Sequence, residues 1–279
     1  MSELNITQAT VNVNGVDIFY RDTGGADKPV MLCLHGRWGR GETYNEFIQH
    51  YHKRYRIIAP DQRGHGLSSK PVATYRGEDM AADMHELLKY LGIGSAIIVG
   101  HSMGARIAGY FAALFSQATI ALAILDEPAD APENTNNFTP EQIPSDDKLT
   151  SQWPTPFTSY AEAKQFLKNK FPFQTSVDYF MHSLAEISEG YDFMFSRYSI
   201  RAIEEYWVSW YDLLPKFTCP VLLVRATESW CLSAESAEKM KPMIKNLTYF
   251  EVSNSDHMVY TDNPEEFFPQ FDKFLNSIK

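Results

Sequence analysis

A serine flanked by two glycines lies at the centre of segment 97–105, which reads IIVGHSMGA. An apolar run precedes the serine and another follows it, so the segment predicts a strand, a tight turn and a helix. Gly100 and Gly104 leave room for the turn that exposes the hydroxyl of Ser102, and the amide end of the next helix points at developing negative charge. The pattern indicates a nucleophile. A glycine-flanked serine in an ordinary turn between a strand and a helix is the alternative.

A nucleophilic serine needs a general base within hydrogen-bonding reach. Of the eight histidines, His257 in the sequence Ser-Asp-His-Met falls on the predicted loop between the last strand and the last helix. His35 and His101 are neighbours of the predicted site, but they belong to segments that shape the backbone. We therefore predict that Ser102 and His257 meet at one edge of the sheet.

The elements around these residues follow an alternating pattern of strands and helices. Short apolar runs, typical of parallel strands buried on both faces, occur at residues 30–34, 56–59, 96–99, 120–125, 220–224 and 247–252. Helical spacing of apolar residues lies between the first four runs, at 42–50, 78–91 and 103–115. Before them, residues 10–21 alternate in polarity around Asn14-Gly15, which predicts an antiparallel hairpin. The sequence thus predicts an α/β fold with a doubly wound, mostly parallel sheet and an N-terminal antiparallel hairpin.

The alternating pattern stops between residues 128 and 215. Several prolines punctuate its first part, and 16 of the 66 residues from 150 to 215 are aromatic, against 14% in the whole chain. Such a density of aromatic side chains needs a surface to cover. We interpret residues 128–215 as a helical cap, inserted into a core domain formed by residues 1–127 and 216–279.

Together these motifs resemble those of the α/β-hydrolases over essentially the whole chain, and most closely the capped esterases and C–C-bond hydrolases. The segment Leu34-His35-Gly36-Arg37 matches the HG loop of the family, and residues 61–68, DQRGHGLS, match its D-x-R-G-x-G-x-S turn, to which we assign a structural role. The resemblance implies that the backbone amides of Arg37 and Met103 form the oxyanion hole.

The acid that orients the base departs from the commonest pattern of the family. In most relatives the acid follows the strand after the cap, but here that turn holds Ser229 at the usual position. Asp126, which ends the strand after the serine's helix, matches an alternative acid position in some members, and it is our preferred candidate. Glu228 is the rival because its longer side chain could compensate for its shifted position. Asp256 is too close to His257 along the backbone.

A serine rather than an aspartate at position 102 disfavours epoxide opening and halide displacement, which use a carboxylate nucleophile in this family. We expect a carboxylic ester of small to medium size, partly apolar, to be hydrolysed through an acyl-enzyme on Ser102, with no metal or organic cofactor. A C–C-bond or amide hydrolase with the same residues is an alternative. A non-catalytic ligand receptor on the same fold is a third.

Residues next to the motifs, Trp38, Arg40, His101 and Trp230, are predicted to contact the substrate, as is Trp210 among the aromatic residues of the predicted cap. The spacing of Trp207, Trp210 and Tyr211 predicts one face of a helix, which docks the cap on the core or, as a weaker alternative, contacts substrate. A carboxylate on the substrate could be bound by arginines, for which the candidates are Arg37, Arg40, Arg197 and Arg201.

The composition limits the partners. A net charge of −10 and a pI near 5.3 argue against nucleic acid or an anionic membrane as a partner, because there is no surplus of basic residues. The polar start of the chain does not resemble a signal peptide, and no apolar run reaches about 18 residues. We expect a cytoplasmic protein with a small-molecule substrate and no insertion into membranes, and we make no prediction of its oligomeric state.

Overall fold

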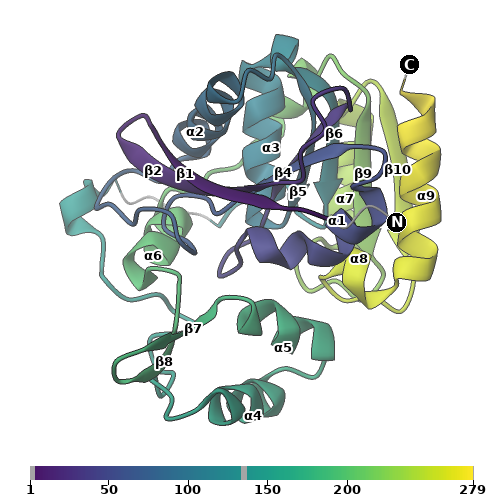
Figure 1. Ribbon diagram of the computed structural model, residues 1–279. Helices are drawn as coiled ribbons and strands as arrows, with labels where there is room; N and C mark the ends of the chain where they lie inside the picture. Colours follow the sequence, from purple (N-terminus) through teal and green to yellow (C-terminus); the bar gives the residue numbers. More distant parts are fainter. Residues whose placement is uncertain (1–3, 133–136, 279) are drawn as a thin grey trace.

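The computed structural model describes residues 4–132 and 137–278, and within these ranges an eight-stranded sheet runs through the molecule in the order β1-β2-β4-β3-β5-β6-β9-β10 (Figure 1). Its strands are β1 (Thr7–Val13), β2 (Val16–Asp22), β3 (Val30–Leu34), β4 (Arg56–Pro60), β5 (Ala96–His101), β6 (Thr119–Leu125), β9 (Val221–Ala226) and β10 (Leu247–Val252). Strand β2 pairs antiparallel with β1 and β4, and every pair from β4 to β10 is parallel. The predicted α/β class, with its N-terminal hairpin, is confirmed.

The central strands β3, β5 and β6 are mostly apolar because helices cover both faces of the sheet. Ile98 in β5 packs among residues of α2 (Gly77–Tyr90) and α3 (Met103–Leu114). Its neighbours Ile97 and Val99 point to the other face and pack among residues of α1 (Asn45–Tyr51) and α9 (Pro264–Ser277). Alternate residues of one strand therefore serve two separate apolar cores, as the continuous apolar runs predicted.

The hairpin between β1 and β2 is set by its turn residues. Asn14 and Gly15 have φ values of 51° and 76°, and Val13 pairs with Val16 across the turn. Two successive residues with positive φ give the kind of two-residue turn that matches the twist of the strands.

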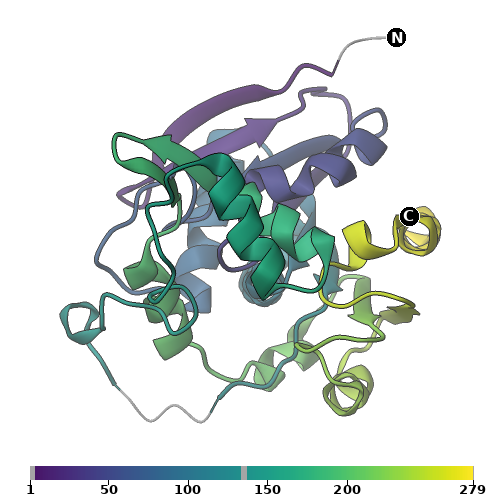
Figure 2. The same ribbon diagram turned by 90° about the horizontal axis from the view of Figure 1, so that it is seen from below.

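Between β6 and β9 the chain leaves the sheet and builds the segment that the sequence predicted as a helical cap, residues 128–215, called the inserted segment below. Its described elements are the 3-10 helix η3 (Pro140–Gln142), α4 (Tyr160–Lys170), α5 (Gln174–Met181), β7 (Leu184–Ile187), β8 (Gly190–Phe193), α6 (Arg197–Glu205) and most of the 3-10 helix η4 (Tyr211–Lys216). Helices α4 and α5 and the β7–β8 hairpin lie below the sheet in Figure 1, and Figure 2 shows the two helices in front of it. They enclose an apolar cluster of their own that includes Trp153, Phe157 and Phe180. The hairpin was not predicted from the sequence.

The predicted helical face of Trp207, Trp210 and Tyr211 is wrong. Helix α6 ends at Glu205 and η4 begins at Tyr211, so both tryptophans lie in the connection between them. Trp210 is fully buried against α3, where a Cβ added to Gly109 would lie 2.8 Å from its ring, and its Nε1 donates to the carbonyl of Pro128 at 2.9 Å. A spacing of three and four residues also occurs where a connection turns back on the core.

None of the helices among the described residues is both long enough and apolar enough to cross a membrane.

Candidate active site

Ser102 occupies a strained turn between β5 and α3. Its φ of 52° and ψ of −130° lie in a region that residues other than glycine rarely adopt. The turn needs glycine on both sides: a Cβ on Gly100 would lie 2.2 Å from the carbonyl oxygen of Gly104, and one on Gly104 would lie 2.0 Å from that of Leu34. The predicted strand, turn and helix are therefore present, with Ser102 at the apex of the turn.

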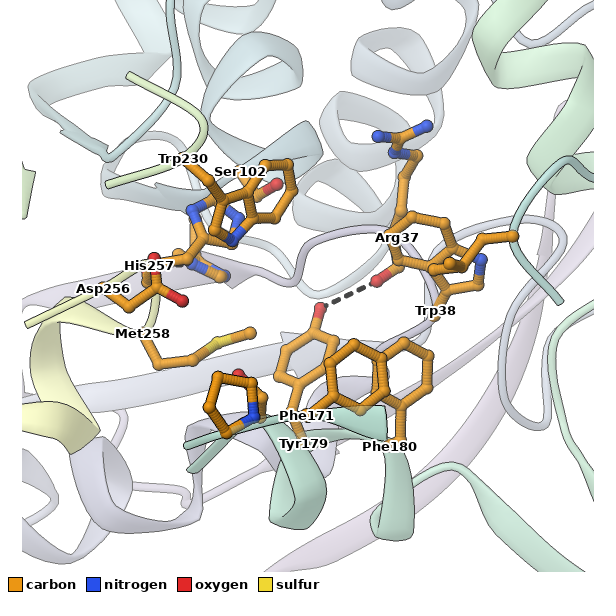
Figure 3. Close-up of a pocket in the computed structure, with 14 residues that line it drawn as sticks. Arg37, Trp38, Ser102, Phe171, Tyr179, Phe180, Trp230, Asp256, His257 and Met258 are labelled. Carbon is orange, nitrogen blue, oxygen red and sulfur yellow. Dashed lines mark hydrogen bonds between the residues drawn. The ribbon is translucent and has the colours of Figure 1, made fainter. Parts of the chain in front are cut away.

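His257 lies on the loop between β10 and α8 (Val259–Asp262), and it lines the same cavity as Ser102 (Figure 3). Its Nδ1 atom is 2.7 Å from Oδ2 of Asp126. The structure thus brings the predicted nucleophile, base and preferred acid to one place, although 155 residues separate Ser102 from His257 in the sequence.

Asp126 directly follows β6 and is fully buried. Its Oδ1 accepts a hydrogen bond from the amide of Ala226 at 2.9 Å, and its Oδ2 accepts one from Oγ of Ser229 at 2.6 Å. The rival acid Glu228 is exposed, and among the described residues its side chain makes no hydrogen bond with His257. Asp126, rather than Glu228, therefore faces the imidazole.

The environment favours a neutral imidazole. Burial lowers the pKa of His257 below its ordinary value, and the positive charge of Arg37 lowers it further. Burial raises the pKa of Asp126, and the hydrogen bonds from Ser229 and Ala226 oppose that rise. When the proton of the neutral ring is on Nδ1, that N–H donates a hydrogen bond to Asp126, and Nε2 is free to accept another proton. A general base requires this state.

His101 supports the loop that carries the base. Its Nε2 lies 2.9 Å from the backbone carbonyl oxygen of His257, which can only accept, so Nε2 carries the proton. Burial lowers the pKa of His101 to about 3, so the ring stays neutral at ordinary pH. His101 also lines the cavity, as predicted for a substrate contact.

The HG loop, residues 35–40, is held in place by the D-x-R-G-x-G-x-S turn. Nε2 of His35 accepts from the amide of Gln62 at 2.9 Å, and Nε2 of Gln62 donates to the carbonyl of His35 at 2.7 Å. Asp61 accepts from the amides of Gly41 at 2.7 Å and Leu67 at 2.8 Å. The turn thus connects the loop to the rest of the core through buried hydrogen bonds.

The two residues predicted to supply the oxyanion donors lie at the same site as the predicted nucleophile, Ser102. Met103 follows Ser102 and is the first residue of α3, where a backbone amide has no partner within the helix. Arg37 lines the cavity from the HG loop.

The cavity itself has a volume of about 560 Å³. Figure 3 shows Ser102 and His257 on one side of it and Phe171, Tyr179 and Phe180 of the inserted segment on the other. Its full lining is Arg37, Trp38, His101, Ser102, Leu149, Phe171, Pro172, Ser176, Tyr179, Phe180, Trp230, Asp256, His257 and Met258. Most of these side chains are apolar or aromatic, so the cavity suits an apolar part of a ligand.

Two of the predicted aromatic contacts, Trp38 and Trp230, line this cavity. The ring of Trp230 is 61% exposed and its centroid lies 4.6 Å from that of His257. The ring of Trp38 packs against that of Phe180, and the two ring centroids are 5.8 Å apart. The cavity therefore has one aromatic residue beside the predicted base and another within the HG loop.

Arg40 and Trp210 were predicted to contact the substrate, but among the described residues neither belongs to the lining. Arg40 is buried, with Nη2 at 2.6 Å from Oε1 of Glu42 and Nε at 3.9 Å from Oδ2 of Asp61. Trp210 is part of the core against α3. Neither the position of Arg40 after a motif nor the place of Trp210 in the aromatic-rich segment revealed that each side chain turns away from the cavity.

The four arginines considered as carboxylate ligands all have acidic partners. Arg37 pairs with Glu204 at 2.7 Å, and Arg201 pairs with Glu205 at 2.7 Å. Arg197 lies 3.8 Å from Asp192, and Arg40 pairs with Glu42. Each of the four arginines therefore already has an acidic neighbour, and among the described residues Arg37 is the one of the four that lines the cavity.

Several lining residues were not predicted individually, above all Leu149, Phe171, Tyr179, Phe180 and Met258. Apart from Met258, they come from the inserted segment, and for Phe171, Tyr179 and Phe180 the aromatic density of residues 150–215 was the one signal of their role. Among the described residues, no group of three or more His, Cys, Asp or Glu side chains could hold a metal ion.

A family model described as the alpha/beta hydrolase fold matches residues 29–264 of the chain. The protein therefore belongs to the α/β-hydrolase fold family, and the class predicted from the sequence is confirmed.

Individual proteins that are similar to this chain are identical to it at a minority of the aligned positions. The 2-(acetamidomethylene)succinate hydrolase of Mesorhizobium japonicum is 26% identical over 276 residues, which cover 91% of this chain and 90% of the relative. The bifunctional esterase/perhydrolase of Acinetobacter calcoaceticus is 35% identical over 116 residues, covering 40% of this chain and 41% of the relative. A crystal structure of E-2-(acetamidomethylene)succinate hydrolase has a TM-score of 0.81 at 22% identity, and the match covers 98% of this chain and 100% of that one. That structural likeness shows a shared fold.

Proposed function

We propose that this protein is a serine hydrolase that transfers an acyl group from its substrate to water through Ser102. The proposal is carried by the 2.7 Å contact between Nδ1 of His257 and Oδ2 of Asp126, at a cavity that Ser102 also lines. A carboxylate that fixes the imidazole in this way keeps Nε2 available for the proton of a serine hydroxyl. The strained backbone at Ser102, which presents the hydroxyl at the start of α3, supports the same role.

The reaction begins when Oγ of Ser102 attacks the substrate carbonyl while Nε2 of His257 takes the hydroxyl proton. The amides of Arg37 and Met103 hold the negative oxygen of the tetrahedral intermediate. His257 then gives its proton to the leaving group, and the acyl group remains on Ser102. A water molecule that loses a proton to His257 attacks this ester, and its hydrolysis releases the acid and restores the serine.

The proposed substrate is a carboxylic ester with an apolar acyl group of small to medium size. The cavity volume of about 560 Å³ and the apolar side chains of the inserted segment support this choice. The pairing of Arg37 with Glu204 also favours an uncharged acyl group over an acidic one.

An amide is the second candidate substrate. The name of the relative from Mesorhizobium japonicum includes an acetamido group, and the same serine chemistry accepts amides as acyl donors. A C–C-bond hydrolase would use the same residues, with a carbon leaving group in place of an alcohol or amine.

The test compares a p-nitrophenyl ester and a p-nitroanilide with the same medium-chain acyl group, in the wild type and in Ser102→Ala. We expect rapid ester hydrolysis and covalent labelling by a fluorophosphonate, both lost in Ser102→Ala. Faster turnover of the anilide would favour the amide. A folded wild-type protein that neither turns over the panel nor takes the label would refute the proposal and favour a ligand receptor.

A further inference from the structure

One helix of the inserted segment contacts the HG loop directly. Tyr179, near the end of α5, donates a hydrogen bond from its hydroxyl to the carbonyl oxygen of Arg37 at 3.1 Å, shown as the dashed line in Figure 3. Ser183, two residues beyond α5, donates from Oγ to the carbonyl oxygen of Trp38 at 2.6 Å. Two consecutive carbonyls of the HG loop are therefore held by one short stretch of the inserted segment.

The glycines of the HG loop are needed for this contact. A Cβ added to Gly39 would lie 2.2 Å from the hydroxyl oxygen of Tyr179. A Cβ added to Gly36 would lie 2.8 Å from the same oxygen and 3.0 Å from Cβ of Ser102. The hydroxyl of Tyr179 thus fills the space in front of both glycines, close to the nucleophile.

The loop has a conformation that needs external support. Trp38 has a φ of 64°, which is uncommon for a residue with a bulky side chain and costs free energy unless its surroundings hold it. The hydrogen bonds to the carbonyls of Arg37 and Trp38 fix the peptide planes on both sides of Trp38. They restrain the backbone immediately after the amide of Arg37.

We propose that Tyr179 is a positioning residue, which aims the amide of Arg37 at the oxyanion by holding the HG loop from the inserted segment. This inference rests on the proposed function, because it gives Tyr179 a role in stabilising the tetrahedral intermediate. Burial raises the pKa of Tyr179 well above its ordinary value, so the hydroxyl stays protonated and remains a donor. The inserted segment is then part of the catalytic apparatus as well as the lining of the cavity.

Tyr179→Phe tests the proposal because it removes the hydroxyl and keeps the ring in the apolar cluster of the inserted segment. Loss of an oxyanion donor costs about 10²–10³-fold in kcat, and a misaimed donor should cost about tenfold or more, with KM nearly unchanged. Tyr191→Phe, in β8 and outside the cavity lining, is the matched control and should keep wild-type kcat.

A second readout separates positioning from packing. A boronic acid that carries the acyl group of the substrate forms a tetrahedral adduct with the serine, whereas the product acid binds without one. The affinity of Tyr179→Phe for the boronic acid should fall in parallel with kcat, while its affinity for the product acid stays at the wild-type level. Ser183→Ala, which frees the carbonyl of Trp38, should show the same pattern, and it carries the test if Tyr179→Phe does not fold.

The outcomes separate this inference from the proposed function. If the wild type has no Ser102-dependent turnover, the proposed function fails. If the wild type is active and Tyr179→Phe retains its kcat and its boronic acid affinity, the inference about Tyr179 alone is overturned. A higher KM with unchanged kcat would also overturn it, because the hydroxyl would then bind the substrate rather than position the loop.

Discussion

Replacing Asp126 with asparagine should disable the base and preserve the shape of the site. In the wild type, Oδ2 of Asp126 accepts from both His257 and Ser229, and Oδ1 accepts from the amide of Ala226. Asparagine has a single acceptor oxygen. Because the backbone amide of Ala226 is fixed in place, it keeps that oxygen at the position of Oδ1. The NH₂ group then faces the imidazole and donates a hydrogen bond to Nδ1. Because Nδ1 can accept this bond only when it carries no proton, the proton of the neutral imidazole moves to Nε2.

A proton on Nε2 prevents His257 from taking the hydroxyl proton of Ser102. The wrong tautomer lowers kcat by about 10⁴-fold in a serine triad, equivalent to about 5 kcal/mol in transition-state free energy. The assay is kcat for a p-nitrophenyl ester, with the temperature of unfolding measured alongside. Because asparagine has the same size as aspartate, a large fall in kcat should accompany a small fall in Tm.

Glu228→Gln is the matched control. Glu228 is exposed and its backbone amide donates to the carbonyl of Ser255, a contact that the substitution retains. We expect kcat within about twofold of the wild type, as for an exposed side chain away from the reacting groups. If Glu228→Gln loses activity while Asp126→Asn stays within about tenfold of the wild type, the assignment of the acid is wrong.

Three further predictions concern the turn, the cavity and the pH dependence. Gly104→Ala places a Cβ 2.0 Å from the carbonyl oxygen of Leu34, which is backbone, so the free energy of unfolding in a denaturant titration should fall by about 1–3 kcal/mol or more; an unchanged value would contradict the close approach of α3 to β3. Trp230→Ala removes a ring that is 61% exposed, so Tm should barely change, while kcat/KM should fall more for aromatic esters than for an acetate ester; equal losses would exclude Trp230 as a substrate contact. Burial lowers the pKa of His257 from its ordinary value of 6.5, so the imidazole stays unprotonated to lower pH. The acid limb of the profile of kcat/KM against pH should therefore have its midpoint below 6.5. A midpoint above about 7 would show instead that the imidazole is stabilised in its charged form.

Features set by local sequence could be predicted from the chain alone. The turn at Ser102 depends on Gly100 and Gly104, and the hairpin depends on Asn14 and Gly15, so a few consecutive residues decide each backbone. The alternation of strands and helices along the chain could also be predicted, because the central strands form short, nearly continuous apolar runs.

Features set by tertiary packing could not be predicted in this way. Arg40 is the last residue of the HG loop, but its pairing with Glu42 and Asp61 turns it away from the cavity. Tyr179 is one of many aromatic residues in the inserted segment, and its contact with Arg37 depends on how α5 lies against the HG loop. Composition indicated that this segment covers a surface, but the direction of each side chain depends on the packing of segments far apart in the chain.

The position of Asp126 depends both on local sequence and on the pairing of two strands in the sheet. Strands β6 and β9 are parallel neighbours, with Leu125 paired to Val224, and the amide of Asp126 donates to the carbonyl of Val224 at 2.9 Å. Their carboxyl ends therefore lie side by side, and a carboxylate after either strand can reach an imidazole above that edge. Because Asp126 supplies the carboxylate from β6, the usual acid position after β9 is free to hold Ser229, whose hydroxyl becomes a donor to that carboxylate. Placing the acid at the end of the adjacent strand preserves a contact between a carboxylate and His257, so the departure from the common pattern is compatible with the proposed triad.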